Sequence, residues 1–215
     1  MEIQTQLTAV RQAVQDQLPP QTFAQLMQNA EELVESGITQ QSLKAGDRAP
    51  DFALPNQKGD LIRSPDLLAQ GPLVLSFNRG SWCPYCNVEL GGLQVALPAM
   101  QELGAQVAAI APQVTRWREG DQELPFAMLR DRGNRVARQF GLVFQVPSAL
   151  RPVYEQLGIL LPRYNEDESF ELPITATYII NPQGVIAYAF VNADYTQRID
   201  PVELISELRQ IQAIV

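Results

Sequence analysis

Hydrophobic residues recur every three or four positions through the first 36 residues, and this spacing predicts two amphipathic helices. The first helix ends at the Leu-Pro-Pro sequence of residues 18–20, and the second runs from about residue 21 to residue 36. The apolar stripe of the first helix consists of Ile3, Leu7, Val10 and Val14. We expect residues 1–45 to form a helical N-terminal extension that packs as a cap on the main domain. Because the stripe also resembles a short heptad seam, a homodimer surface is the alternative.

From residue 46 onward, strand-forming runs alternate with helical patterns. The expected strands are 73–78, 105–111 and 125–131, and the expected helices are 64–71, about 84–100, 114–120 and 134–141. Residues 149–158 are expected to form a turn or a short helix. Residues 161–173 are expected to form an acidic loop. Ser64 is the expected N-cap of its helix. Two β-rich runs within 175–191 are joined by an Asn-Pro-Gln-Gly turn and predict a hairpin. In the last helix, Asp200 is the expected cap, and Glu203 stands where a capping-box carboxylate belongs.

This order of elements predicts an α/β fold. Alternating strands and helices give a parallel sheet, and the hairpin adds an antiparallel edge. With helices on both faces, the result is a three-layer sandwich with a mixed central sheet, expected to span residues 46–215. Open α/β sheets usually place their sites at the carboxyl ends of the strands. Both cysteines of the chain, Cys83 and Cys86, follow the first central strand at that edge.

The composition narrows the classes of function. Sixteen basic and 24 acidic side chains give a net charge of −8, which argues against binding nucleic acid or an anionic membrane surface. No stretch resembles a signal peptide or reaches transmembrane length, so a cytoplasmic location is the default expectation. Two thiols and no histidine are too few ligands for a structural zinc site, so we expect no metal.

The close pair of cysteines therefore indicates redox chemistry. Cys83 precedes a helix that begins near Pro84, where unpaired backbone N–H groups and the helix dipole favour a thiolate. Arg79 can add a positive charge, and Trp82 can form an apolar wall. Cys86 lies three residues after Cys83 and so falls on the same face of the helix. Cys83, nearer the helix start and expected to be the more exposed, is predicted to attack, and Cys86 to resolve the adduct as a disulfide.

Three motifs of the chain resemble motifs of a known family and occur in the same order. Residues 46–60 follow the pattern GxxAPDFxLxxxxG, residues 77–86 read "FNRGSWCPYC", and residues 176–186 read "ATYIINPQGVI". In these motifs the chain resembles the peroxiredoxins of the alkyl hydroperoxide reductase/thiol-specific antioxidant (AhpC/TSA) type, over about residues 46–213. The resemblance implies a thioredoxin-like fold, a peroxide substrate, a thioredoxin- or glutaredoxin-type reductant and no cofactor.

The chain departs from that family around the site. Typical members carry PxxxTxxC or PxxxSxxC, and the matching positions here hold Ser76 and Gly80, so the usual hydroxyl is missing. The family's second arginine corresponds to Thr175. A group that polarises the peroxide would then be Arg79, Arg198 or the backbone.

The "WCPYC" core also resembles thioredoxins and glutaredoxins, which place a cis-proline opposite the cysteines. Pro173 is the candidate for that proline, and a loop-to-strand boundary is its other interpretation.

Three hypotheses follow in this order. The first is a thiol peroxidase in which Cys83 attacks hydrogen peroxide or an organic hydroperoxide and Cys86 resolves the sulfenic acid. The second is a protein dithiol–disulfide oxidoreductase. The third is a non-enzymatic redox sensor whose thiols switch the surface formed by residues 1–45.

Overall fold

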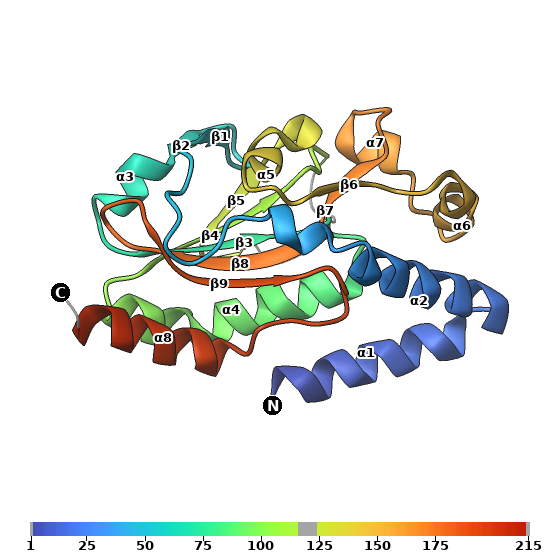
Figure 1. Ribbon diagram of the computed structural model, residues 1–215, viewed down its shortest axis with the longest axis horizontal. Helices are drawn as coiled ribbons and strands as arrows, with labels where there is room; N and C mark the ends of the chain where they lie inside the picture. Colours follow the sequence, from blue (N-terminus) through green and yellow to red (C-terminus); the bar gives the residue numbers. More distant parts are fainter. Residues whose placement is uncertain (1, 116–123, 214–215) are drawn as a thin grey trace.

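Five strands form a mixed central sheet in the computed structural model, which describes residues 2–115 and 124–213 (Figure 1). In spatial order the strands are β5 (Ala127–Arg130), β4 (Gln106–Ala111), β3 (Leu73–Phe77), β8 (Thr175–Ile180) and β9 (Ile186–Asn192). Strands β3, β4 and β5 are parallel, and β8 runs antiparallel to both β3 and β9. The predicted α/β fold, with a parallel core and an antiparallel hairpin, is confirmed.

Helices lie on both faces of this sheet. Helices α4 (Pro84–Glu102) and α8 (Pro201–Ala213) lie below it in Figure 1, while α3 (Ser64–Leu68) and α5 (Arg135–Gln139) lie above. Strand β3 is buried along its whole length, and its side chains alternate between the two faces. Leu73, Leu75 and Phe77 pack in the core on one face, and Val74 packs in the core on the other face with residues of α4 and α8.

The smaller elements correct part of the expected pattern. Strand β1 (Ala53–Pro55) pairs with β2 (Leu61–Arg63), and β6 (Val143–Gln145) pairs with β7 (Glu171–Pro173). Short helices are α6 (Arg151–Gln156), α7 (Leu161–Asn165) and three 3-10 turns, η1 (Ile38–Gln41), η2 (Arg132–Asn134) and η3 (Ser148–Leu150). The prediction of a loop over residues 161–173 is thus wrong, because this segment contains α7 and β7. Strand β7 depends on pairing with a distant segment, which no local pattern reveals. Most of the helix expected at 114–120 lies outside the described residues.

The two predicted helix caps differ in outcome. The Asp200 carboxylate accepts a hydrogen bond from the N–H of Val202 at 2.8 Å, so this cap is confirmed. The carboxylate of Glu203 accepts from the Tyr188 hydroxyl instead of the cap backbone. Ser64 lies inside α3, and its hydroxyl oxygen accepts from the N–H of Phe52 at 2.9 Å, so its predicted capping role is wrong.

The N-terminal extension lies against the helix that carries the cysteines. Helix α1 (Ile3–Gln17) packs on α4 and is followed by α2 (Pro20–Glu35). Ile3 and Leu7, 3% and 4% exposed, are buried in one cluster with Cys83, Tyr85 and Cys86. The apolar stripe of α1 is therefore occupied within the chain at these two positions. A homodimer remains a prediction.

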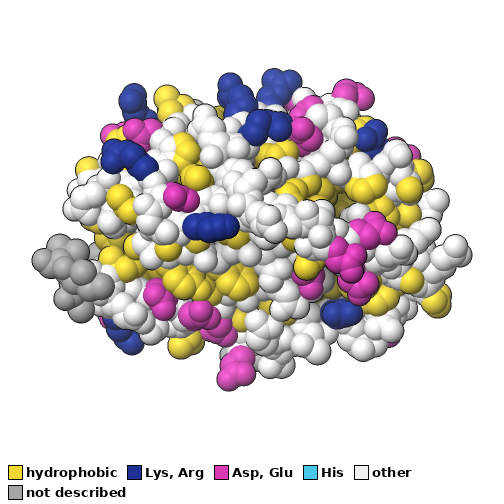
Figure 2. Space-filling model, viewed as in Figure 1, with side chains coloured by type: hydrophobic (Ala, Val, Ile, Leu, Met, Phe, Trp, Pro, Cys, Tyr) yellow, Lys and Arg dark blue, Asp and Glu magenta, His cyan; other side chains and the backbone are white. Residues whose placement is uncertain are grey.

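Charged side chains on the surface and the apolar character of the helices are relevant to the partners that the protein can have. Figure 2 shows both Lys/Arg and Asp/Glu side chains on the viewed face, with several basic side chains together along its upper edge and acidic ones beside them. Within the described ranges, no helix combines the length and the apolar character needed to cross a membrane.

We predict that the contact of α1 with α4 contributes substantially to stability. Leu7→Ala removes a buried side chain, so it should lower the free energy of unfolding by about 2–4 kcal/mol in urea titrations. Leu61→Ala, at a site that is 62% exposed, is the matched control and should change it by less than about 0.5 kcal/mol. Equal small losses in the two variants would contradict the packing of α1.

Candidate active site

Cys83 and Cys86 lie at the start of α4, as predicted. Cys83 is the N-cap residue and Pro84 is the first residue of the helix. Both thiols are free, with 1% and 0% of their surface exposed. The expected difference in exposure between the two cysteines is therefore no more than 1% against 0%, because α1 and Tyr195 pack against the start of the helix.

The structure brings both candidate arginines to the cysteines. Arg79 and Arg198 are each 3% exposed. Nη2 of Arg198 donates a hydrogen bond to Sγ of Cys86 at 3.3 Å. The Arg79 guanidinium lies 4.1 Å from the ring centre of Tyr195 and 4.9 Å from that of Trp82.

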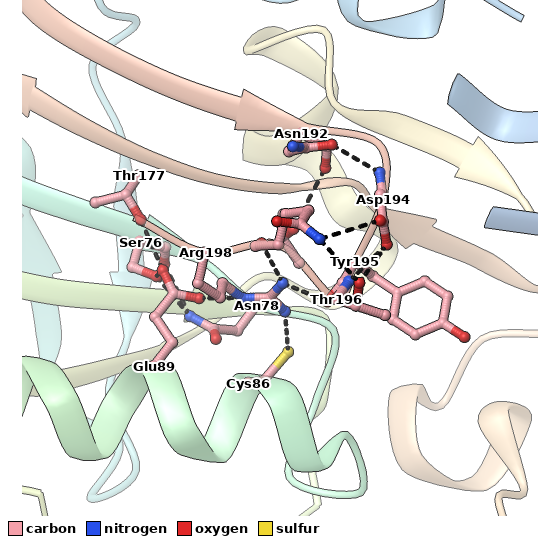
Figure 3. A network of polar contacts seen from close by, with 12 residues as sticks. Ser76, Asn78, Cys86, Glu89, Thr177, Asn192, Asp194, Tyr195, Thr196 and Arg198 are labelled. Carbon is pink, nitrogen blue, oxygen red and sulfur yellow. Dashed lines mark hydrogen bonds and ion pairs between the residues drawn. The ribbon is translucent and has the colours of Figure 1, made fainter. Parts of the chain in front are cut away.

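A buried polar network fixes the position of Arg198 (Figure 3). Its Nε atom forms an ion pair with Oε2 of Glu89 at 2.6 Å, and its Nη1 atom donates to the backbone carbonyl of Gln197 at 2.7 Å. Oε1 of Glu89 accepts hydrogen bonds from Thr177 at 2.7 Å and from Ser76 at 3.1 Å. Ser76 and Thr177 are partners in the register of β3 and β8. The sheet thus holds the carboxylate, and the carboxylate holds the guanidinium beside Cys86.

The surroundings of the two thiols shift their pKa values in opposite directions. Burial by itself would raise the pKa of Cys83, but a hydrogen bond from the Cys86 thiol and the charges of Arg79 and Arg198 outweigh it, so the pKa lies well below its ordinary value. The pKa of Cys86 is raised by burial, by the hydrogen bond that its thiol donates to Cys83 and by the charge of Cys83. The charge of Arg198 opposes this rise. The pair therefore favours a thiolate on Cys83 and a thiol on Cys86.

The missing hydroxyl at Gly80 has a steric explanation. Gly80 has a φ of +148°, and a Cβ atom there would lie 2.5 Å from Nε1 of Trp82 and 3.0 Å from Oε1 of Gln113. The indole of Trp82 therefore occupies the space that a threonine or serine side chain would need. In this loop the departure from the usual motif and the presence of Trp82 are linked.

The other two predicted site residues have different roles. The Thr175 hydroxyl donates to the backbone carbonyl of Asn192 at 3.4 Å. Pro173 lies in β7, where it is paired with Val143. No peptide bond among the described residues is cis, so the cis-proline role is wrong and Pro173 belongs to a strand end.

A pocket of about 180 Å³ leads to Cys83. Arg79, Trp82 and Tyr85 line it, and each carries a buried donor atom with no hydrogen-bond partner in the described part of the chain: Nε, Nε1 and the hydroxyl, respectively. Tyr154, whose hydroxyl accepts a hydrogen bond from Nη2 of Arg79, also lines the pocket. The site thus combines a stabilised sulfur anion with donors that can bind a small oxygen-containing molecule.

Glu89, Thr177, Tyr154 and Tyr195 are site residues that the sequence analysis missed. Glu89 alone gave a signal, because it occupies a buried position of an otherwise apolar helix face, three residues after Cys86. The others come from segments that only the tertiary fold brings to the cysteines. The described residues contain no cluster of three or more side chains suited to hold a metal ion.

The chain is similar in sequence to known proteins. The sequence model of the AhpC/TSA family matches residues 45–189. Peroxiredoxin Bcp of Escherichia coli K12 is 33% identical over 104 residues, which is 46% of this chain and 65% of that protein. A putative peroxiredoxin of Mycobacterium tuberculosis H37Rv is 31% identical over 114 residues, 52% of this chain and 74% of that protein. The chain thus matches slightly less than two thirds of the length of the E. coli relative.

Solved structures support the fold. Peroxidoxin BcpB from Mycobacterium tuberculosis superposes with a TM-score of 0.58 at 21% identity, covering 79% of this chain and 98% of that one. A peroxiredoxin 6 mutant from Arenicola marina gives a TM-score of 0.62 at 17% identity, covering 79% and 74%. The predicted thioredoxin-like architecture is confirmed by these neighbours.

We predict that the two thiols ionise in the order given by their surroundings. Thiolate absorbance of the reduced protein, followed as pH rises, should show a first step below the ordinary thiol pKa of about 8.5. This step should persist in Cys86→Ser, and the remaining thiol of Cys83→Ser should ionise at higher pH. The reverse order in the two variants would assign the thiolate to Cys86.

A second prediction concerns the contact between Gly80 and Trp82. Gly80→Ala and Gly59→Ala both place alanine at a positive φ, but nothing lies within 4 Å of the added atom at Gly59. The clash with Trp82 should therefore cost Gly80→Ala about 1–3 kcal/mol more in the free energy of unfolding. Equal losses in urea titrations would mean that the indole moves aside freely.

Proposed function

The chain belongs to the AhpC/TSA family, and from this membership we propose that it is a thiol peroxidase that reduces hydrogen peroxide or organic hydroperoxides through Cys83 and Cys86. The observation that carries the proposal is the placement of Cys83. Cys83 lines a pocket, its pKa is lowered by Cys86, Arg79 and Arg198 against the effect of burial, and three residues of the same lining carry buried donors that have no partner among the described residues.

In the first step the Cys83 thiolate attacks one oxygen of the hydroperoxide. A sulfur–oxygen bond forms, the oxygen–oxygen bond breaks, and the alkoxide or hydroxide that leaves takes up a proton as alcohol or water. Cys83 is oxidised to a sulfenic acid. The buried donors of Arg79, Trp82 and Tyr85 are suited to stabilise the charge that develops on the leaving oxygen.

In the second step Cys86 resolves the sulfenic acid. Its sulfur attacks that of Cys83, a disulfide forms, and the hydroxyl leaves with the thiol proton as water. The thiolate required for this attack is favoured by the hydrogen bond from Nη2 of Arg198. Their positions at the N-cap and third residue of α4 place the two cysteines on one face of its first turn.

A dithiol reductant completes the cycle by reducing the disulfide. We propose a reductant of thioredoxin or glutaredoxin type, which supplies two electrons and two protons. The oxidised pair is held where both cysteines are buried, so α1 must move away before another protein can reach the disulfide. The cytoplasmic location remains a prediction.

The same burial makes the protein dithiol–disulfide oxidoreductase the second candidate, because α1 would have to move before its first step and not only for re-reduction. That activity requires a protein disulfide to approach the attacking sulfur, and Cys83 is 1% exposed. A hydroperoxide is small enough to use the pocket. The redox-sensor hypothesis also remains, because α1 packs directly on the cysteine cluster.

The proposed function predicts which oxidised species form with one equivalent of hydrogen peroxide. Mass spectrometry of the wild-type protein should find a Cys83–Cys86 disulfide. Cys86→Ser cannot form it and should accumulate a sulfenic acid on Cys83, trapped by dimedone, while Cys83→Ser should show neither product. A sulfenic acid on Cys86, or oxidation of wild-type protein no faster than that of a free thiol, would overturn the proposal.

A further inference from the structure

The pocket that leads to Cys83 is built partly by the N-terminal extension. Val14 and Leu18 from the end of α1, together with Leu26 from α2, line it. The region matched by the family begins at residue 45, so this wall lies outside it. The sequence analysis assigned no chemistry to the extension, but the structure places it directly over the reactive sulfur.

The shape and lining of the pocket indicate what it can hold. Leu157 and Ile159 face the extension from the segment after α6, and Tyr195 and Tyr154 add aromatic surface. Its volume is about 180 Å³, and an apolar cavity of about 150 Å³ is large enough for a benzene ring. Hydrogen peroxide has only two heavy atoms and offers nothing that such walls can bind.

Apart from Gln17 of α1, the polar side chains of the lining include Arg79, Trp82 and Tyr85, from the same segment as Cys83. Arg79 is the basic residue among the described lining residues, and its Nε atom has no hydrogen-bond partner within the described ranges. A hydroperoxide with an apolar body can place its oxygens among these donors and its hydrocarbon against the extension. The lining therefore combines apolar side chains of the extension with polar groups of the segment that carries Cys83, as such a molecule requires.

We propose that the N-terminal extension is a substrate-binding element that selects hydroperoxides carrying an aryl or short branched-alkyl group over hydrogen peroxide. This inference rests on the proposed peroxidase function of the same site. The apolar group binds between α1, α2 and the 157–159 segment, which directs the oxygen–oxygen bond toward Cys83. The chemistry is unchanged: the hydroperoxide is reduced to its alcohol, and the two thiols are oxidised to a disulfide.

Stopped-flow oxidation of the reduced protein tests the selection. The wild-type protein should react at least about tenfold faster with cumene hydroperoxide than with hydrogen peroxide, since small apolar groups in a fitted pocket are worth this factor or more. Val14→Phe fills the pocket from α1 and should reduce the ratio of the two rates by about tenfold. Ala13→Phe adds the same ring at the neighbouring, exposed position of α1 and should leave the ratio unchanged.

A binding measurement separates failure of this inference from failure of the peroxidase proposal. Calorimetry with 2-phenylpropan-2-ol, the alcohol formed from cumene hydroperoxide, should detect binding to the wild-type protein and to Ala13→Phe but not to Val14→Phe. Leu26→Trp, which fills the pocket from α2, replaces Val14→Phe if that variant does not fold. Alcohol binding without peroxide turnover would overturn the peroxidase and leave the binding site. Turnover with equal rates for the two peroxides, or no alcohol binding, would overturn the role of the extension.

Discussion

The ion pair between Glu89 and Arg198 joins segments that are far apart in the sequence. Glu89 belongs to α4, Arg198 to the segment before α8, and the hydroxyls that complete the carboxylate's surroundings belong to β3 and β8. Taking two such charges out of water costs several kcal/mol for each ion, which close contact and further hydrogen bonds offset. Apolar side chains could fill this space at no such cost. The ion pair is therefore better explained by its effect on position, since it holds the Arg198 guanidinium 3.3 Å from the Cys86 sulfur.

The difference between the two arginines adds to the effect of the hydrogen bond between the two thiols, which is the larger cause of the lowered pKa of Cys83. Arg198 has a carboxylate partner, so much of its charge is already compensated where it contacts Cys86. Arg79 forms no ion pair with a carboxylate in the described part of the chain, and its neighbours are the Tyr154 hydroxyl and aromatic rings. Its uncompensated charge lies near the pocket that contains Cys83. The thiolate is thus favoured on the sulfur that a substrate can reach, and the proton is retained on the one that acts second.

Local patterns were enough to predict the sheet, the helices around it and the position of Cys83 at a helix start, because strand period, helix caps and proline placement depend on near neighbours in the chain. The surroundings of the pair were not predictable in this way. Burial of Cys83 depends on α1, some 70 residues earlier in the sequence. The Glu89 network depends on the register of β3 with β8, and the wall of the pocket depends on Tyr195 and Tyr154. Gly80 was visible as a departure from the motif, but its cause, the indole of Trp82, required coordinates.

A site without histidine also responds differently to pH. An imidazole near pH 6.5 would gain or lose its charge in the same range as the thiol that it activates. Arginine remains protonated far above that range, so the charges of Arg79 and Arg198 are constant wherever the protein is folded. The helix N-terminus is likewise a fixed partial charge. The fraction of reactive thiolate then follows the ionisation of Cys83 alone, and a protein with no histidine in its 215 residues keeps its nucleophile charged down to the lowered pKa of that one sulfur.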